Sequence, residues 1–205
     1  MKVLVTGGAG YIGTELVERL TQDSGVDEVV VYDNLTRKNY NLFLFHHLPG
    51  NKVRFIEGDI LDSRRLGKVV KDVDVIVHLA ARVTTPFAAQ DPHFFEQVNH
   101  WGTAELVYGF SDGMVDESSI PTPKTYYGFS KRRGEEHVER LQNKLNTQII
   151  RLGNVYGFSP SMRFDAVLNR FMMEANMNNR ISIHGTGKQH RPFIHVSQVV
   201  DALSQ

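Results

Sequence analysis

A glycine-rich segment follows the first apolar run of the chain almost at once. Residues 3–5 form that run, and Gly7, Gly10 and Gly13 then recur with the spacing G-x-x-G-x-x-G. Where a strand turns into a helix, the free N–H groups and the positive end of the helix dipole attract a phosphate. Gly13 also lets the helix pack closely against the strand. The segment therefore predicts a pyrophosphate-binding turn, and the alternative is a turn that only permits tight packing.

Apolar, β-branched runs alternate with amphipathic stretches along most of the chain. This alternation is typical of βαβ units, and it predicts an α/β fold with a Rossmann-type, doubly wound parallel sheet. The expected strands are residues 3–5, 29–32, 53–56, 75–77 and 148–150, and the expected helices lie near residues 12–20, 63–70, 95–107 and 130–145. A loop is expected at residues 118–124 and a polar turn at residues 176–180.

An acidic residue, Asp33, ends the second expected strand about 20 residues after Gly13. A carboxylate at that place accepts hydrogen bonds from both ribose hydroxyls of adenosine. It also favours NAD over NADP, because a 2′-phosphate would meet its negative charge. Arg37 and Lys38 follow closely and can counter that charge. The sequence thus predicts NAD as the cofactor.

Two further segments end expected strands, at Gly58–Ile60 and at His78–Ala81. Because ligands bind outside the carboxyl ends of strands in an open parallel sheet, both segments are expected at the cofactor. Asp59 is expected to hold the adenine amino group or to cap the next helix, and these two roles do not exclude each other. The small alanines of the second segment leave room for the nicotinamide half. His78 is interpreted as a core histidine with a satisfied ring.

A tyrosine and a lysine, Tyr127 and Lys131, lie at positions i and i+4 of an expected helix. At this spacing the two side chains lie one above the other. An ammonium beside a phenol stabilises the phenolate, so the tyrosine can exchange a proton with a substrate hydroxyl while hydride moves to or from a nicotinamide. The alternative is a surface helix start with a solvated lysine. Tyr126 has Ser130 four residues further on, so the prediction falls on Tyr127.

Composition and charge exclude several other classes of protein. The 23 basic and 23 acidic residues balance to a formal net charge of zero, which disfavours nucleic-acid binding. No apolar run approaches the roughly 20 residues that span a membrane. The chain has no cysteine, which excludes disulfides, thiolate metal sites and cysteine nucleophiles, and no metal site is expected. The N-terminal residues have no signal-peptide layout, so a cytoplasmic location is expected.

Several of these motifs occur together in one known family. The chain resembles the extended short-chain dehydrogenase/reductases, and within them the NAD-dependent epimerase/dehydratase group with its UDP-glucose 4-epimerase-like sugar-nucleotide enzymes. The resemblance covers nearly the whole chain. It rests on residues 5–13, 33–35, 58–59, 78–81, 99, 102–103, 127–131, 151–157 and 184–196.

The resemblance implies roles for particular side chains. Tyr127 is the expected catalytic base, and Lys131 is expected to assist it and to hold the nicotinamide ribose. Asn154 is the expected contact to the sugar nucleotide, and Arg191 is the expected clamp on its diphosphate, a role that suits the arginine fork. A surface ion pair is the alternative for Arg191, and residues 167–171 are expected to line the nucleotide base. The expected cofactor-binding residues are Gly7, Gly10, Tyr11, Ile12, Gly13, Asp33, Asn34, Asp59, Ile60, Leu79, Ala80, Ala81, Asn99, Tyr127 and Lys131.

The chain departs from the family pattern at two places. Family members carry a Ser or Thr on the fifth strand, a few residues before a Tyr-Gly pair, whereas Glu105–Val107 precedes the matching Tyr108–Gly109 here. The apolar periodicity shows the same gap, because a helix, a strand and a second helix are expected between Val77 and Ile149 and the strand is missing. The chain also ends soon after His195, where family members continue. Two explanations stay open: residues left out of this sequence, which we favour because losing an internal strand is costly, or a chain that is short by nature.

We therefore predict an NAD-binding Rossmann domain over residues 1–152 and a small, incomplete substrate-binding part over residues 153–205, interleaved with the first. The leading hypothesis is an NAD-dependent sugar-nucleotide epimerase that acts through a transient keto sugar. The alternatives are a sugar-nucleotide 4,6-dehydratase, which needs an Asp-Glu acid/base pair near the fifth strand, and a non-catalytic NAD-binding module. The expected substrate is a nucleotide-diphosphate sugar. By the resemblance, a homodimer is expected through the two helices that flank the fifth strand.

Overall fold

The computed structural model describes residues 1–44, 51–83, 91–101, 126–142, 145–183, 185–188 and 190–205. Internal packing divides the chain into two compact units. The first unit comprises Met1–Glu57, Asp72–Leu79 and Leu152–Gln205, and the second comprises Gly58–Lys71 and Ala80–Arg151. The C-terminal residues belong to the same unit as the first strands. This division follows packing alone, and the functional boundary expected at residue 152 stays a prediction.

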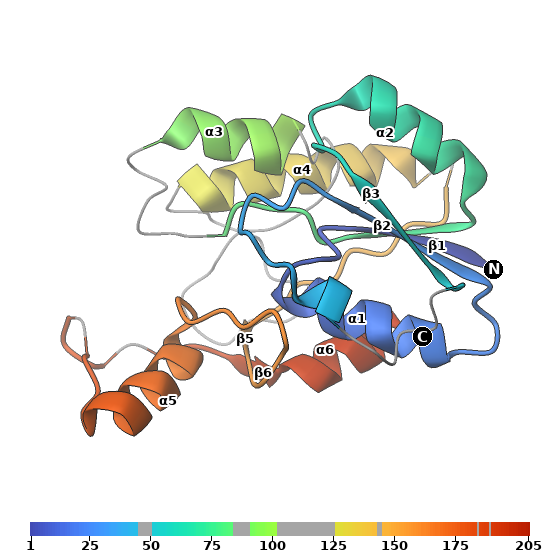
Figure 1. Cartoon of the computed structure of the whole chain (residues 1–205). Coiled ribbons are helices and arrows are strands. Elements are labelled where there is room, and N and C mark those ends of the chain that lie inside the picture. Colours follow the sequence, from blue (N-terminus) through green and yellow to red (C-terminus); the bar gives the residue numbers. More distant parts are fainter. Residues whose placement is uncertain (45–50, 84–90, 102–125, 143–144, 184, 189) are drawn as a thin grey trace. The chain divides into compact units, whose positions relative to one another are not determined.

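The first unit is built on a four-stranded parallel sheet (Figure 1). Its strands are β1 (Lys2–Thr6), β2 (Glu28–Asp33), β3 (Val53–Glu57) and β4 (Val75–His78), in the order β3-β2-β1-β4. Every pair of neighbours in this sheet is parallel. The two central strands, β1 and β2, are buried along nearly their whole length, as their apolar sequences require. The predicted α/β fold with a parallel sheet is confirmed.

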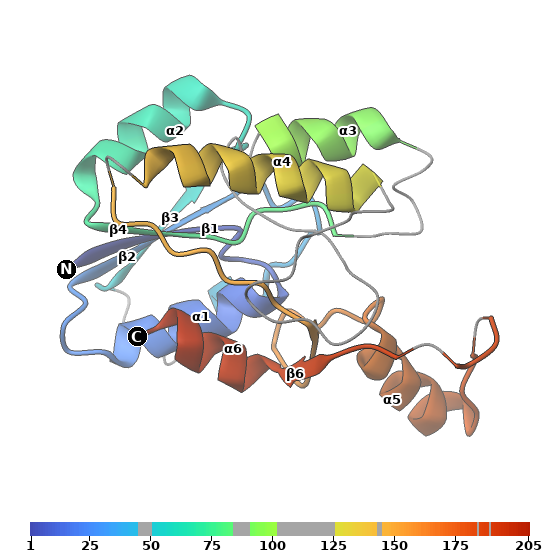
Figure 2. The same cartoon turned by 180° about the vertical axis from the view of Figure 1, so that it is seen from behind.

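Two helices, α1 (Tyr11–Gln22) and α6 (Val196–Leu203), lie side by side on one face of this sheet (Figure 1, Figure 2). Their buried side chains, among them Leu16, Val17 and Val200, share one apolar core with β1 and β2. Full burial of each such side chain contributes about 1.5–3 kcal/mol to folding. The packing of α1 therefore fixes the position of the glycine-rich turn from which this helix starts.

A histidine caps the start of α6. The His195 Nδ1 atom accepts a hydrogen bond from the Ser197 N–H at 3.2 Å, and the Gln198 side chain accepts one from the His195 N–H at 3.3 Å. This reciprocal pair is a capping box in which histidine takes the place of the usual Ser or Thr. It fixes the residue at which α6 begins.

A second, two-stranded parallel sheet belongs to the same unit. It pairs β5 (Asn154–Tyr156) with β6 (Phe193–His195), and α5 (Val167–Asn178) lies between these strands in the sequence. Asn179 ends α5 in a left-handed conformation, with a φ angle of 50°. The polar turn expected at residues 176–180 is therefore wrong at residues 176–178, which belong to the helix, and the chain leaves the helix only at Asn179.

The second unit is helical in the part that the structure describes. It contains α2 (Ser63–Val69) and α3 (Pro92–Glu96), and α3 passes directly into a wider π-helical turn, η4 (Gln97–Trp101). The longer α4 (Tyr126–Leu141) packs against both α3 and η4 (Figure 2). Short 3₁₀ turns elsewhere in the chain are η1 (Asn41–Leu44) and η2 (Val70–Asp72).

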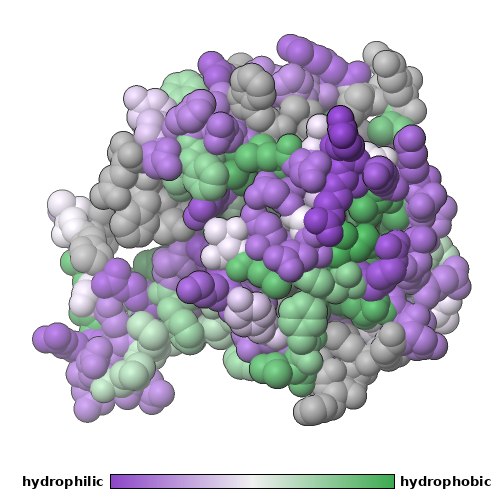
Figure 3. Space-filling model, turned by 45° about the horizontal axis from the view of Figure 1, so that its top comes forward, coloured by the Kyte–Doolittle hydropathy of each residue, from purple (hydrophilic) through white to green (hydrophobic). Residues whose placement is uncertain are grey.

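Apolar side chains also reach the surface. On the face shown in Figure 3, hydrophobic residues lie between hydrophilic ones. Large apolar side chains that are more than half exposed include Leu44, Phe158, Met177 and Ile183. None of the helices in the described part of the chain is long and apolar enough to cross a membrane.

Most expected elements occur where the sequence predicts them, and one expected strand is wrong. Residues 148–150 pair with no other described strand, and Ile150 is 37% exposed. Two adjacent isoleucines satisfy strand propensity, but a strand also needs a neighbour to pair with. The helix expected from Ser130 already begins at Tyr126, so Tyr127 lies in its first turn. The strand gap at residues 108–114, the loop at 118–124 and the expected helix beyond residue 101 fall outside the described residues.

Candidate cofactor and catalytic site

The glycine-rich turn has no space for side chains at its key positions. Gly7 has a φ angle of +70°, which only glycine adopts without strain. A Cβ atom on Gly13 would lie 2.4 Å from the Gly7 carbonyl oxygen and 2.6 Å from the Gly8 Cα. Gly10 is the N-cap of α1, and it offers no side chain to the N–H groups of the first turn. The turn thus presents unblocked helix N–H groups, as a pyrophosphate requires.

Asp33, at the end of β2, is hydrogen-bonded to the same turn. Its Oδ2 atom accepts from the Ala9 N–H at 3.1 Å, and its Oδ1 atom accepts from the Leu35 N–H at 2.8 Å. Burial raises the pKa of the Asp33 carboxyl, and the two backbone N–H groups limit that rise. Each carboxylate oxygen keeps a further lone pair. The carboxylate is therefore oriented and still able to accept the two ribose hydroxyls predicted for it.

The residues after Asp33 make their own contacts. The Asn34 Oδ1 atom accepts a hydrogen bond from the Thr36 N–H at 3.1 Å. An Arg37 guanidinium nitrogen lies 3.4 Å from the Asp165 Oδ2 atom, at the start of the segment that leads into α5. Arg37 was considered as a countercharge to Asp33. Its ion pair with Asp165 gives that guanidinium a different acidic partner in the first unit.

The end of β4 is fixed by the neighbouring strand. The Leu79 N–H donates to the Thr6 carbonyl at 2.9 Å, and the His78 Nδ1 atom lies 2.5 Å from the Thr6 hydroxyl. His78 is half-buried and its ring has a hydrogen-bond partner. This agrees with the interpretation of His78 as a satisfied structural histidine.

In the second unit, Asp59 is not a helix cap. Its Oδ1 atom accepts from the Leu61 N–H at 2.9 Å, and the side chain that caps α2 is Asp62, which accepts from the Arg65 N–H at 2.9 Å. The cap interpretation of Asp59 is therefore wrong, because a cap must directly precede the first helical residue. The adenine role of Asp59 stays a prediction, and the neighbouring Ile60 is buried.

Asn99 holds the chain segment that follows β4. This fully buried side chain accepts from the Arg82 N–H and donates to the Arg82 carbonyl, both at 2.8 Å. The oxygen and the nitrogen of the Asn99 amide are thus both paired with the backbone of Arg82. Ala80 and Ala81 directly precede Arg82 in the chain. Asn99 was predicted among the cofactor-binding residues, and its described contacts assign it to positioning this segment.

Tyr127 and Lys131 lie in the first two turns of α4. Tyr127 is half-buried, whereas the neighbouring Tyr126 is 59% exposed. Burial lowers the pKa of the Lys131 ammonium to about 8. Because this value still exceeds neutral pH, most Lys131 side chains carry a charge there. The partly buried lysine differs from the alternative of a fully solvated lysine, and its role beside a phenolate stays a prediction.

Sequence reasoning missed a buried acid on the same helix, Glu135. Its side chain is only 2% exposed, and its Oε1 atom lies 2.7 Å from an Arg151 guanidinium nitrogen. Its Oε2 atom lies 3.2 Å from Arg132. Tyr127, Lys131 and Glu135 follow one another at steps of four residues, so they share one helix face. That spacing was the available signal, because a carboxylate on the helix face that carries Lys131 needs a partner when it is buried.

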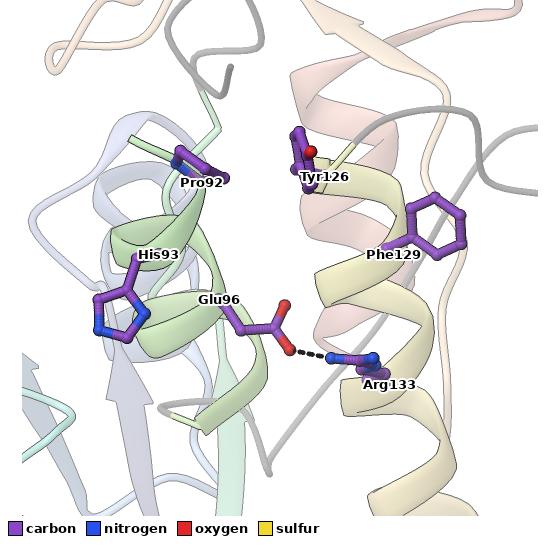
Figure 4. A pocket seen from close by; sticks show the side chains of 6 residues that line it. All are labelled: Pro92, His93, Glu96, Tyr126, Phe129 and Arg133. Atoms are coloured by element: carbon purple, nitrogen blue, oxygen red, sulfur yellow. Dashed lines mark hydrogen bonds and ion pairs between the residues drawn. The ribbon is translucent and has the colours of Figure 1, made fainter. Parts of the chain in front are cut away.

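A shallow groove of about 410 Å³ lies between α3 and α4 (Figure 4). Figure 4 shows Glu96 of α3 paired with Arg133 of α4 across it. The groove is lined by Tyr126 and not by Tyr127. The groove is therefore formed by the packing of two helices, and it is separate from Tyr127, the predicted catalytic side chain.

Of the two predicted substrate residues, Asn154 is the first residue of β5, and Arg191 lies two residues before β6 begins. The Asn154 N–H donates to the Pro192 carbonyl at 2.8 Å, and the Asn154 side-chain amide lies 3.3 Å from the same oxygen. Arg191 directly precedes Pro192, and it is exposed. Segments that lie far apart in the sequence are thus joined at the point where both substrate contacts were predicted.

This combination of a parallel α/β sheet, a glycine turn and a tethered acid at the end of β2 defines a dinucleotide-binding protein. The chain matches the model of the NAD dependent epimerase/dehydratase family over residues 3–112 and 97–205. It belongs to that family. The prediction from the sequence motifs is confirmed, and NAD is the cofactor of the family.

Individual relatives include both epimerases and dehydratases. The mouse (Mus musculus) dTDP-D-glucose 4,6-dehydratase is 33% identical, and the match covers 98% of this chain and 63% of the relative. Among solved structures, DesIV, a dTDP-glucose 4,6-dehydratase from Streptomyces venezuelae with NAD and TYD bound, superposes with a TM-score of 0.84 at 27% identity, over 100% of this chain and 71% of that one. UDP-glucuronic acid 4-epimerase from Bacillus cereus was solved in complex with UDP-glucuronic acid and NAD. It superposes with a TM-score of 0.81 at 27% identity, over 100% of this chain and 74% of that one.

The chain is shorter than these relatives inside the matched region as well. The alignment with the mouse protein runs over 229 positions, although this chain has only 205 residues. The relative therefore carries residues that face gaps in this chain. This supports the prediction that the present sequence lacks internal residues of the family pattern.

We predict that Gly13→Ala weakens NAD binding at least tenfold, because the new Cβ atom would displace the backbone at Gly7 and Gly8. Titration of the full-length protein with NAD, followed by calorimetry, measures the effect. The matched control is Gly67→Ala, since a Cβ atom there meets nothing within 4 Å. Alanine is also the better helix former, so the control keeps its NAD affinity and gains slightly in stability. Equal NAD affinities for the two variants would contradict the assignment of the turn.

Proposed function

We propose that the protein is an NAD-dependent sugar-nucleotide epimerase of the UDP-glucose 4-epimerase type. The observation that carries this proposal is the Tyr127–Lys131 pair on α4, with its partly buried ammonium, in a chain of this family. The names of the relatives support a nucleotide-diphosphate sugar as the substrate. The chain spans 63% of the length of the mouse relative. We therefore propose the activity, the substrate and the roles of the site residues together.

The proposed mechanism gives each side chain one task. The Tyr127 phenolate takes the proton of a sugar hydroxyl, and the Lys131 ammonium holds the phenol pKa down so that the phenolate forms. NAD supplies the hydride acceptor for that carbon and later the hydride donor. Asn154 and Arg191 hold the nucleotide diphosphate while the keto sugar turns over. Tyr127 then returns the proton, and the hydride has arrived on the opposite face, so no net oxidation occurs.

A sugar-nucleotide 4,6-dehydratase is the second candidate, because the mouse relative and DesIV both carry that name. It uses the same oxidation, but it also needs an Asp-Glu acid/base pair near the fifth strand. That stretch falls outside the described residues. Product analysis separates the two, since an epimerase returns an isomer of the substrate whereas a dehydratase releases water.

We predict that Tyr127→Phe lowers turnover by at least 10²-fold, the usual contribution of a general acid–base group, while NAD still binds. The measurement is turnover of UDP-glucose or dTDP-glucose by the full-length protein, with NAD affinity measured in parallel. Tyr126→Phe is the matched control, because that neighbouring ring is 59% exposed and has Ser130 four residues further on. Unchanged turnover in Tyr127→Phe would remove the catalytic assignment.

We also predict that kcat/KM falls as the pH rises above about 8. Burial lowers the pKa of Lys131 to about 8, so the ammonium loses its proton, and the phenolate its stabilising charge, above that pH. Lys131→Arg keeps a positive charge at every accessible pH. This variant is therefore expected to lose the alkaline fall, whatever its absolute rate. A pH profile of kcat/KM for the native protein and for Lys131→Arg tests this. An identical fall of kcat/KM in the variant would mean that a group other than Lys131 causes it.

We further propose that the protein forms a homodimer through α3 and α4. Two aromatic side chains on α4, Tyr126 and Phe129, are more than half exposed beside the groove of Figure 4. Aromatic residues are enriched at protein interfaces. Phe129→Asp is expected to halve the mass measured by light scattering, because the charge would be buried at the interface. Phe158→Asp, at a 75% exposed phenylalanine of the first unit, is expected to stay dimeric, and a monomeric native protein would exclude this proposal.

A further inference from the structure

A buried polar network in the first unit joins the glycine-rich turn to α5. Four polar side chains in it, Thr14, Ser159, Ser161 and Asn169, are at most 1% exposed. Polar groups buried to this extent are costly unless they are hydrogen-bonded. Each of the four has a hydrogen-bond partner within the network. None of these contacts is used by the mechanism proposed above.

Tyr11 is the link on the side of the turn. Its hydroxyl donates to the Gly157 carbonyl at 2.7 Å, and its own carbonyl accepts from the Ser159 hydroxyl at 2.8 Å. Burial raises the pKa of the Tyr11 phenol, which keeps it protonated as a donor. Tyr11 is the first residue of α1, directly after Gly10. A shift of the turn is therefore passed to residues 157–159 through two hydrogen bonds.

Thr14 makes a second connection one turn further along α1. Its hydroxyl lies 2.8 Å from the Ser161 hydroxyl and 2.8 Å from the Gly10 carbonyl. The Ser161 N–H in turn donates to the Ser159 hydroxyl at 3.3 Å. The same loop is thus held at two points by the first turn of α1.

Asn169 is the link on the side of α5. Its Oδ1 atom accepts from the Gly157 N–H at 3.0 Å, and its Nδ2 atom donates to the Arg163 carbonyl at 3.1 Å. One side chain of α5 therefore clamps both ends of the loop from residue 157 to residue 163. This loop and α5 shift together because one amide bonds to both of them.

Gly157 prevents the loop from yielding on its other side. It has a φ angle of +116°, and a Cβ atom there would lie 2.4 Å from the His195 Nε2 atom. The backbone of the loop thus lies directly against the imidazole ring at the end of β6. With this contact behind it, the loop transmits displacement between Tyr11 and Asn169 instead of absorbing it.

We propose that this network couples the two ligand sites, so that NAD at the glycine turn and a nucleoside diphosphate beside α5 strengthen each other's binding. The proposal rests on the proposed function and on the family resemblance, which implies that residues 167–171 of α5 line the nucleotide base. The network includes the first helical residue behind the pyrophosphate and the middle residue of that α5 segment. Such coupling is reciprocal by thermodynamic necessity, and its usual size is about 5–150-fold.

The test uses the full-length protein freed of NAD, with UDP and dTDP as probes. Calorimetry measures the Kd of the tighter-binding probe with and without saturating NAD, and the Kd of NAD with and without that probe. The native protein is expected to show at least fivefold tightening in both directions, by the same factor. Tyr11→Phe removes one hydroxyl and its hydrogen bond to Gly157, and it is expected to reduce the factor below twofold.

Two further variants make the result specific to the network. Ser159→Ala cuts the other bond to Tyr11 and is expected to reduce the factor as well. Tyr40→Phe makes the same chemical change as Tyr11→Phe at a tyrosine that is 54% exposed, and it is expected to keep the native factor. Thermal unfolding of each variant checks that it is folded.

The outcomes separate this proposal from the one it rests on. Native binding of both ligands without mutual tightening would overturn the coupling and leave the proposed function standing. A native factor retained by folded Tyr11→Phe and Ser159→Ala would also overturn it. Failure of both probes to bind, with or without NAD, would overturn the proposed function and the coupling together.

Discussion

The close approach of α1 to the glycine-rich turn that follows β1 is the contact on which the rest of the first unit depends. It exists only because position 13 has no side chain, since a Cβ atom there would meet the Gly7 carbonyl at 2.4 Å. With α1 held this close, Leu16 and Val17 reach the core that also contains the side chains of α6. The same contact brings the Ala9 N–H to Asp33. One missing methyl group thus supports both the core packing and the orientation of Asp33, the acid predicted to bind the cofactor.

Two buried polar clusters, one in each unit, differ in charge. In the first unit, neutral groups such as Ser159, Ser161 and Asn169 pair with backbone and hydroxyl groups. In the second, a charged acid, Glu135, is buried against two arginines on the helix that carries Lys131. Breaking one partner of a buried ion pair leaves an uncompensated charge, whereas loss of one neutral bond costs less. The neutral network can therefore change its hydrogen bonds at low cost, which suits coupling between two ligand sites. The ionic network resists such a change, which suits a helix that stays fixed.

The sequence predicted local structure well because glycine spacing and strand–helix alternation are local signals. The glycine-rich turn, β1 to β4 and α2 all depend on residues close together in the chain. The strand at residues 148–150 was wrong because pairing depends on a distant neighbour. The cap role considered for Asp59 is wrong because a second acid, Asp62, lies directly before the helix, and only geometry decides between the two.

The candidate site residues also divide into local and tertiary signals. The i, i+4 spacing predicts the pair Tyr127 and Lys131, and the burial that lowers the lysine pKa became visible only in the fold. Neither the clamp of Asn99 on Arg82 nor the joining of Asn154 to Pro192 has a short-range signature. Both are tertiary hydrogen bonds, and the residue types alone fit several other partners.

The histidine cap of α6 differs from a Ser or Thr cap in one respect. Its imidazole ring caps the helix and also fills the space beside Gly157, where an added Cβ atom would lie 2.4 Å from the Nε2 atom. A Ser or Thr at position 195 would keep an acceptor for the Ser197 N–H but would leave that space empty. One ring therefore holds both the backbone of the loop at Gly157 and the start of α6 at Val196, a residue of the apolar core shared with α1.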